Sequence, residues 1–114
     1  MIIVRSPLRI SLGGGGTDLP SFYEKAGTIF CSAAIDKYIY VAVSKPFENR
    51  IFVRYSKQEE SQSIEDIKHP IVRESLRLIY PNVSSIEIAS FADIPSGTGL
   101  GSSSAVTVGV LNAL

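Results

Sequence analysis

The sequence predicts an α+β fold, in which helices pack on a mixed or antiparallel β-sheet. Runs of β-branched and aromatic residues in the first half of the chain are typical of strands. Later segments space their apolar residues as amphipathic or buried helices do. Glycine-rich loops interrupt both halves. With 114 residues, 45% of them hydrophobic, the chain forms one domain at most.

The first half of the chain is expected to be mainly extended. Residues 2–12 predict one bent strand or two short ones, because Pro7 lacks the N–H that a ladder hydrogen bond needs. The strands expected after it are 28–32, 38–44 and 51–55, with turns at 36–37 and 46–49. An antiparallel meander is the simplest arrangement of these strands. Cys31 is expected to be a small buried residue of its strand.

A short helix is expected at residues 20–25, directly after the first glycine loop. Thr17 or Asp18 precedes it as a capping residue, and Gly27 follows it as a stop signal. Asp18 therefore has a structural interpretation that stands beside any contact with a ligand.

The second half predicts two more helices and one strand. Residues 70–80 carry apolar side chains at helical spacing, and Pro81 ends this helix. The polar, aperiodic residues 56–67 indicate an exposed connection, whereas residues 86–91 indicate a strand. Residues 102–114 predict a helix without charges, which is normally buried all round. Because this helix reaches the last residue without a glycine C-cap, we expect the chain to be a fragment of a larger domain.

Composition excludes several classes of protein. The 11 basic and 11 acidic residues cancel, so no basic field favours nucleic acid and no cationic face favours a membrane surface. The apolar runs are shorter than the ~20 residues of a membrane span, and the first residues lack a signal-peptide pattern. We therefore expect a cytoplasmic protein. A single cysteine and a single histidine exclude an internal disulfide and a clustered zinc site.

The second glycine loop predicts a phosphate-binding site between a strand and a helix. Gly97, Gly99 and Gly101 alternate along it, so the backbone can bend sharply and bring its N–H groups close to an anion. The helix that follows adds its positive end. The serines at 102–104 can cap the helix, bind phosphate oxygens or coordinate magnesium. The alternative is a glycine-rich turn that only caps a buried helix.

Other glycine motifs fit this loop poorly. A Walker A loop needs a lysine after its last glycine, and none follows Gly101. A dinucleotide fingerprint needs an acidic residue ~20 positions further on, and a nucleophile elbow needs a second glycine after the serine. Neither condition is met.

The two loops together resemble a known family. The segment Ser6-Pro7-Leu8-Arg9-Ile10-Ser11-Leu12 runs into four glycines and Thr17-Asp18, and the phosphate-type loop follows at a distance. This pair of motifs, in this order, resembles the GHMP kinases, the family of galactokinase, homoserine, mevalonate and phosphomevalonate kinases. Residues 1–114 resemble the N-terminal portion of the GHMP kinase N-terminal domain, a fold shared with a ribosomal-protein domain. The branch most similar includes D-glycero-D-manno-heptose 7-phosphate kinase and fucokinase-type sugar kinases.

The resemblance implies ATP- and Mg²⁺-dependent phosphorylation of a small sugar or sugar phosphate, such as a heptose 7-phosphate. It implies that Arg9 lies near the transferred phosphoryl group as a catalytic residue. It implies that Gly16, Thr17 and Asp18 bind the sugar, with Asp18 contacting its hydroxyls. It assigns Mg²⁺ to Ser102 or Ser103. The residues implied to hold the ATP phosphates are Pro95, Gly97, Thr98, Gly99, Leu100, Gly101, Ser102 and Ser103.

The chain departs from the family pattern at two points. Gly15 and Gly16 stand where galactokinase-like members have an acidic residue and a histidine, which argues against galactose and leaves room for a bulkier or phosphorylated sugar. The family's catalytic aspartate and third glycine motif are expected beyond residue 114, so this chain alone should bind its ligands poorly and catalyse little. The competing hypothesis is a non-catalytic nucleotide- or anion-binding module. A third is an inert truncated product that self-associates through its apolar C-terminal helix.

Overall fold

The computed structural model describes residues 1–15, 17, 19–95 and 97–114. Within this part of the chain, five strands form one sheet in the order β1-β2-β5-β3-β4. Strands β3 and β5 pair in parallel, and the other neighbours pair antiparallel. The elements in chain order are β1 (Ile2–Gly13), α1 (Pro20–Ala26), β2 (Cys31–Ser44), β3 (Ile51–Arg54), β4 (Gln58–Ser61), the 3-10 helix η1 (Ile64–Asp66), α2 (Pro70–Ile79), β5 (Ile86–Ala92) and α3 (Ser102–Ala113).

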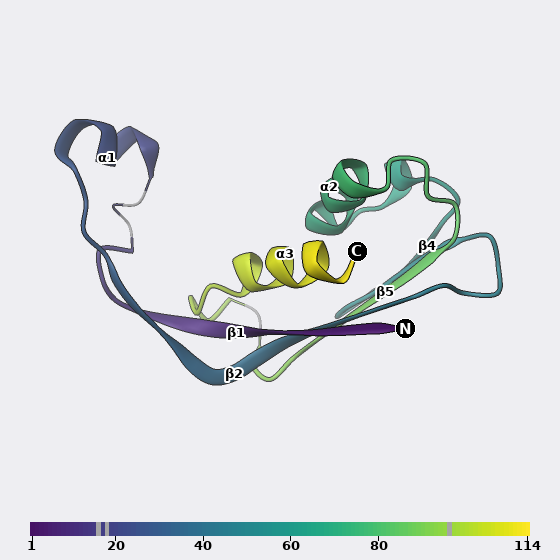
Figure 1. The fold of residues 1–114 in the computed structure, drawn as a ribbon, viewed down its shortest axis with the longest axis horizontal. Coiled ribbons are helices and arrows are strands. Elements are labelled where there is room, and N and C mark those ends of the chain that lie inside the picture. Colours follow the sequence, from purple (N-terminus) through teal and green to yellow (C-terminus); the bar gives the residue numbers. More distant parts are fainter. Residues whose placement is uncertain (16, 18, 96) are drawn as a thin grey trace.

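The predicted α+β class is confirmed, and helices cover only one face of the sheet. Helix α3 packs on β1 and β2, and α2 packs beside α3 (Figure 1). Buried side chains of the strands and of both helices form one core between these layers, and burying each large one contributes about 1.5–3 kcal/mol. The largest fully buried members are Leu8, Val41, Ile51, Val53, Ile67, Leu76, Ile88 and Val110.

Strand β1 is a single bent strand, one of the two predicted forms. Its register with β2 shifts after Pro7, which lies opposite Tyr38, whereas Arg9 lies opposite Ala34. Three residues of β2, 35–37, therefore face one residue of β1. The turn predicted at 36–37 is wrong: these residues form an irregularity inside one long strand, because β1 continues to pair on both sides of it.

The predicted antiparallel meander is also wrong. Strand β5 lies between β2 and β3, antiparallel to the first and parallel to the second. Two parallel strands need a crossover connection, and β4, η1 and α2 together provide it. The order of the strands along the chain does not predict that β5 lies between β2 and β3, because contacts between distant segments determine which strands pair.

The predicted exposed connection at 56–67 contains structure instead. Residues Gln58–Ser61 form β4, an edge strand paired with β3, and Ile64–Asp66 form η1. The side chains of Ile64 and Ile67 are 6% and 0% exposed, so they belong to the core. Their spacing of three residues matches one turn of a 3-10 helix, and the polar residues around them hid this pattern.

Helix α1 forms as predicted, but Thr17, one of its two predicted caps, does not cap it. Leu19 occupies the cap position and has no polar side-chain atom, while Gly27 ends the helix with φ +68°. The Thr17 hydroxyl donates to the carbonyl of Gly14 at 2.8 Å instead. The alternative cap, Asp18, lies outside the described residues. The Thr17 hydroxyl therefore bonds within its own loop instead of capping α1.

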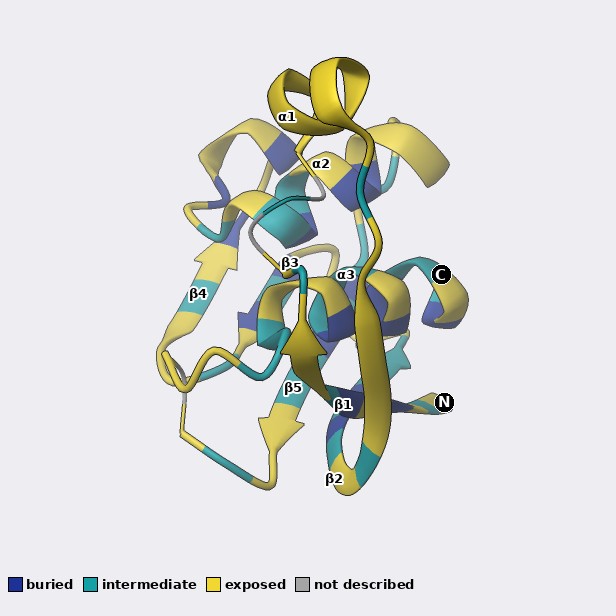
Figure 2. Cartoon of the chain, turned by 90° about the vertical axis from the view of Figure 1, so that its left-hand side faces the viewer, coloured by how far each residue is buried: buried dark blue, intermediate teal, exposed yellow. Residues whose placement is uncertain are grey.

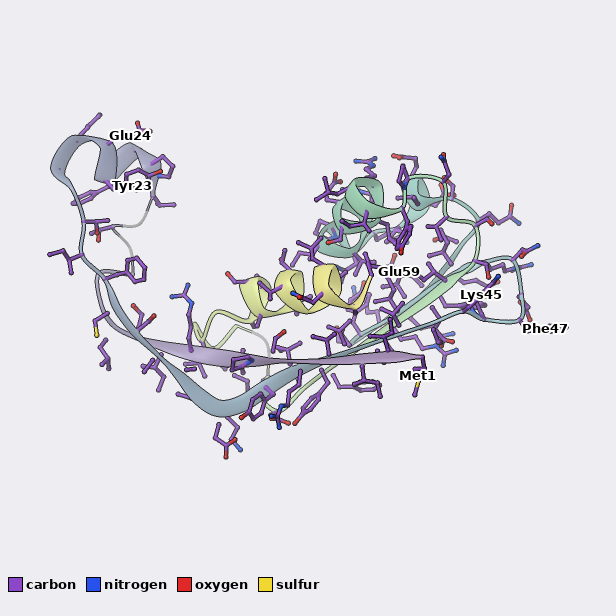
Figure 3. All side chains as sticks on the ribbon, in the orientation of Figure 1. Met1, Tyr23, Glu24, Lys45, Phe47 and Glu59 are labelled. Carbon is purple, nitrogen blue, oxygen red and sulfur yellow. The ribbon has the colours of Figure 1, made fainter. Side chains whose placement is uncertain are left out.

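Helix α1 projects from the end of the long β1–β2 ribbon. No residue of α1 is buried (Figure 2), and Tyr23 and Glu24 lie at the opposite end of the molecule from Phe47 (Figure 3). Cys31, predicted to be buried, is exposed. It lies in the part of the β1–β2 ribbon that extends past α2 and α3, so neither helix covers it (Figure 1). Helix α1 therefore contributes no side chain to the hydrophobic core.

Helix α3 is buried on one side rather than all round. Ala105, Gly109, Val110 and Ala113 are buried, whereas Val108 is 53% exposed. Among the described residues, no helix has both the length and the apolar character needed to cross a membrane.

The close contact between α3 and β2 predicts that Gly109→Val destabilises the chain. A Cβ at position 109 would lie 2.9 Å from Cγ2 of Val41 and 3.2 Å from Oγ of Ser6. Val41 is fully buried and β-branched, so it cannot move aside cheaply. We expect a loss of about 1–3 kcal/mol in the free energy of unfolding, measured by urea denaturation.

Val108→Ala is the matched control, because its side chain is the exposed neighbour on the same helix. It should change the free energy of unfolding by less than about 0.5 kcal/mol. Equal stability of Gly109→Val and the wild type would contradict the packing of α3 on β2.

Candidate functional site

The second glycine loop has the backbone conformation that its sequence predicts. It connects β5 to α3, and Gly97, Gly99 and Gly101 have φ of +83°, +73° and +73°. These angles lie in the left-handed region, which costs residues with a Cβ about 1–2 kcal/mol each. Glycine is thus needed at all three positions to bend the chain. Ser96, which precedes Gly97, lies outside the described residues.

The loop leads into the N-terminus of α3, which has no side-chain cap. Gly101 is the cap residue of α3, and its carbonyl accepts from the N–H of Ala105 at 3.0 Å. Because glycine has no side chain, it cannot satisfy the free N–H groups of the first turn. The first turn also contains no acidic residue. These N–H groups and the helix dipole suit an anion such as a phosphate.

Arg9 of β1 lies directly against this loop. Its backbone N–H donates to the carbonyl of Leu100 at 3.1 Å. An ideal Cβ on Gly101 would lie 3.1 Å from Nε and 3.2 Å from Cγ of Arg9, so the side chain packs on the glycine. The structure thus brings together the first motif's arginine and the second motif's last glycine. The guanidinium adds a fixed positive charge beside the anion-binding end of α3.

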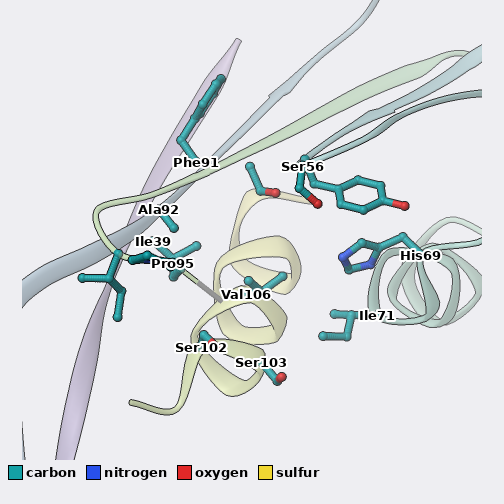
Figure 4. A pocket seen from close by; sticks show the side chains of 13 residues that line it. Ile39, Ser56, His69, Ile71, Phe91, Ala92, Pro95, Ser102, Ser103 and Val106 are labelled. Atoms are coloured by element: carbon teal, nitrogen blue, oxygen red, sulfur yellow. The ribbon is translucent and has the colours of Figure 1, made fainter. Parts of the chain in front are cut away.

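Two cavities flank α3 at this end. The first, of about 430 Å³, is lined by Pro95, Ser102 and Ser103 next to the loop (Figure 4). The second, of about 580 Å³, is lined by Arg9 and Ser104 among others. Positions 104 and 108 lie on one face of a helix, and 102 and 106 on another. The first turn of α3 therefore presents different serines to two separate spaces.

The far end of the first cavity carries an aromatic pair. Tyr55, just after β3, and His69, just before α2, pack edge to face with ring centroids 4.7 Å apart. The Tyr55 hydroxyl donates to Oε1 of Glu59 at 2.6 Å, and the backbone N–H of Lys68 donates to Oε2 at 2.6 Å. Glu59 thereby ties β4 to the start of α2 and fixes the Tyr55 ring.

The charge of Glu59 shapes both pKa values in this cluster. Burial by itself raises the pKa of the Glu59 carboxyl, but the hydrogen bond from Tyr55, the backbone N–H groups of Lys68 and His69 and the nearby His69 side chain together lower it below its ordinary value. The hydrogen bond that the Tyr55 hydroxyl donates to Glu59, together with burial, raises the pKa of Tyr55. At neutral pH the pair is therefore a carboxylate bonded to a neutral phenol.

Sequence reasoning missed this cluster. The sequence places Glu59 in the exposed connection 56–67 and predicts His69 as a surface residue at the start of the helix at 70–80, so only the position of His69 at a helix start is confirmed. The available signal was the His-Pro pair itself, because Pro favours the first position of a helix and the residue before it is then the cap. His69 is that cap, and its side chain accepts from the N–H of Val72.

The first glycine loop forms a separate cluster near α1. Thr17 hydrogen-bonds to Gly14, and its hydroxyl also pairs with that of Thr28. A Cβ on Gly14 would lie 2.3 Å from the carbonyl oxygen of Ile29, so the loop packs tightly on the returning strand. Gly16 and Asp18 lie outside the described residues. Figure 1 places this loop at the tip of the ribbon, away from the start of α3.

Carboxylate, imidazole and thiol groups do not supply a ready-made metal site. Within residues 1–15, 17, 19–95 and 97–114, no three of the His, Cys, Asp and Glu side chains gather around one point. A divalent cation at α3 would therefore depend on serine hydroxyls and on oxygens of a ligand, the coordination that Mg²⁺ takes with nucleotide phosphates.

Comparison with known proteins gives consistent results. Residues 68–114 match the family described as "GHMP kinases N terminal domain". The D-glycero-alpha-D-manno-heptose 7-phosphate kinase of Campylobacter jejuni is 29% identical over 98% of this chain and 36% of its own length. The chain is similar to the N-terminal part of GHMP kinases. This GHMP-kinase-like chain spans little more than a third of that relative.

Solved structures share the fold of this GHMP-kinase-like chain. A D-glycero-D-manno-heptose 1-phosphate kinase from Bacteroides thetaiotaomicron has a TM-score of 0.84 at 24% identity, over 97% of this chain and 40% of its own. The mevalonate kinase of Methanococcus jannaschii has a TM-score of 0.75 at 22% identity, over 98% and 38%. At these identities the likeness establishes the fold, and the expected GHMP kinase architecture is confirmed.

The hydrogen bonds of Glu59 predict a pH-dependent contribution to stability. A carboxyl whose pKa is lowered by folding stabilises the folded state above its ordinary pKa of about 4.3, and this contribution is lost as the pH falls through the lowered value. We expect Glu59→Gln to reduce the free energy of unfolding by about 1 kcal/mol at pH 7. The difference from the wild type should shrink steadily below about pH 4.

Urea denaturation at pH 7 and pH 3 measures this effect. Glu24→Gln on the exposed helix α1 serves as the control and should match the wild type at both pH values. A Glu59→Gln deficit that stays constant with pH would show that the carboxylate's charge does not hold the cluster together.

Proposed function

We propose that this chain forms the nucleotide-binding N-terminal portion of a sugar kinase, which transfers a phosphoryl group from ATP to a sugar or sugar phosphate. The observation that carries the proposal is the left-handed glycine loop that opens onto the uncapped first turn of α3. Backbone N–H groups, a helix dipole and the Arg9 charge converge there on one anion-binding position. The kinase relatives named above support the same assignment.

The nucleotide fits the first cavity. Its phosphates would lie along residues 97–103, with Mg²⁺ held by phosphate oxygens and the hydroxyl of Ser102 or Ser103. The nucleoside would extend toward Tyr55 and His69, because the cavity runs from the loop to that aromatic pair. Its volume of about 430 Å³ lies within the usual range of small-molecule sites.

The acceptor sugar is assigned to the other side of the loop. Arg9 lines the second cavity and touches Gly101, so it is placed to neutralise charge on a phosphoryl group held at the loop. We assign sugar binding to Gly16, Thr17 and Asp18 on the strength of the motif. A phosphorylated heptose is the preferred acceptor, because the relative from C. jejuni is a heptose 7-phosphate kinase.

Full turnover requires more than these residues. Phosphoryl transfer depends on positioning both reactants, and the resemblance assigns the catalytic aspartate to a segment downstream of residue 114. We therefore propose that residues 1–114 bind MgATP and that a polypeptide with the downstream kinase segment performs the reaction. A stand-alone nucleotide- or anion-binding module is the second candidate, favoured by the uncapped first turn of α3, whose N–H groups suit an anion by themselves.

Gly99→Val tests the phosphate loop. Nothing lies within 4 Å of a Cβ at this position, so the substitution spares the core, but valine cannot easily hold φ +73° and would reshape the loop. We expect MgATP affinity, measured by isothermal titration calorimetry, to fall at least about tenfold, the effect of about 1.4 kcal/mol.

Gly27→Val is the matched control, because Gly27 has φ +68° and equally open surroundings at the end of α1. It also places valine at a positive φ, but far from the loop, and should leave MgATP affinity unchanged. Wild-type MgATP affinity in Gly99→Val, or an equal loss of affinity in both variants, would refute the assignment of the ATP phosphates to this loop.

Asp18→Ala tests the sugar side in a protein that carries this sequence together with the downstream segment. Removal of a carboxylate that accepts sugar hydroxyls should raise the KM for the heptose phosphate about tenfold, or lower kcat, while the KM for ATP changes less than twofold. Equal changes for both substrates, or a loss of folded protein alone, would leave Asp18 a structural residue.

A further inference from the structure

The position of His69 at the start of α2 determines which of its nitrogens carries a proton. Its Nδ1 accepts from the backbone N–H of Val72 at 3.4 Å, which requires a lone pair on that nitrogen. The neutral imidazole then carries its hydrogen on Nε2. The helix cap therefore fixes His69 as a hydrogen-bond donor through Nε2.

The His69 ring faces the proposed nucleotide cavity. It lines the cavity together with Ile71 of α2 and Val106 of α3, and Figure 4 shows the imidazole pointing from α2 into the space between these elements. The apolar side chains of Ile71 and Val106 lie beside it, Ser56 contributes a hydroxyl, and the Tyr55 hydroxyl is bonded to Glu59, so the imidazole N–H has few competing donors. A planar ligand with a ring acceptor would satisfy it.

The orientation of the ring is fixed from a second side. Tyr55 packs edge to face on His69 at an interplanar angle of 79°, and Glu59 holds the Tyr55 hydroxyl. The same carboxylate binds the N–H of Lys68, next to His69 in the chain. The ring is thus held by the α2 cap at one edge and by the Tyr55–Glu59 pair at another, an arrangement that preorganises the donor.

We propose that His69 is the residue of this chain that orients the base of the nucleotide, by donating its Nε2–H to a ring nitrogen of a purine. The proposal rests on the proposed function, because it takes the phosphates to be bound at the glycine loop. A purine has unprotonated ring nitrogens at its edges and an apolar face for the walls at Ile71 and Val106. His69 would contact the base alone, because the phosphates would lie at the opposite end of the cavity, beside Ser102 and Ser103.

The test compares two probes, MgATP and magnesium tripolyphosphate, by isothermal titration calorimetry. Tripolyphosphate carries the charges but no base, so it reports on the glycine loop only. In the wild type both should bind, with MgATP tighter. In His69→Asn, the asparagine oxygen can still cap α2, but the ring donor is removed. We expect MgATP affinity to fall about five- to tenfold and tripolyphosphate affinity to stay within twofold.

His69→Phe separates the donor from the ring. It keeps an aromatic ring beside Tyr55 but has no N–H, so it should lose MgATP affinity as His69→Asn does. If His69→Phe fails to fold because the cap is lost, His69→Asn and its unchanged thermal midpoint decide the question. MgATP affinity that stays at the wild-type value in either folded variant would overturn the proposal. So would a parallel loss for both probes.

These outcomes separate the inference from the proposed function. If the wild type binds neither probe, the phosphate site itself is refuted. If both probes bind and the His69 variants bind MgATP normally, only the role of His69 is refuted.

Discussion

The candidate site depends on the insertion of β5 between β2 and β3. This position buries Ile86 and Ile88 under the helices and makes β5 a central strand. Because β5 ends beside β2, the glycine loop that follows it starts from the middle of the sheet, and α3 can return across β1 and β2. An edge position for β5 would send the loop away from Arg9. The parallel pairing with β3, completed by the crossover through α2, therefore brings the two motifs together.

The first turn of α3 is the point where the two sides of the site meet. Arg9 clamps the loop through its backbone bond to Leu100 and its contact with Gly101. Ser102 and Ser103 face the cavity that ends at Tyr55 and His69. A helix turns about 100° per residue, so Ser104 lies on a different side of α3 and lines the second cavity. This geometry suits a reaction in which a phosphoryl group passes between a donor on one side and an acceptor on the other.

The local elements of the fold were largely predictable. The amphipathic spacing in 70–80 and the uncharged run after Gly101 predicted α2 and α3, and both form with bounds within about one residue of the expected ones. The glycine loop was predicted because alternating glycines have few other uses than positive φ. Three of the predictions that proved wrong share a cause. The turn at 36–37, the meander and the exposed connection at 56–67 all depend on which distant segments pair, and a local pattern carries no information about that.

The residues of the site divide in the same way. The sequence by itself determined the glycine loop and the helix that follows it, since both depend on backbone conformation and on neighbouring residues. Only the tertiary structure decided that Arg9 touches Gly101, and that Tyr55, Glu59 and His69 form a cluster at the other end of the same cavity. The physical reason is that sequence-local features follow from φ, ψ and helical period. Contacts between segments far apart in the chain follow from burial of the whole core.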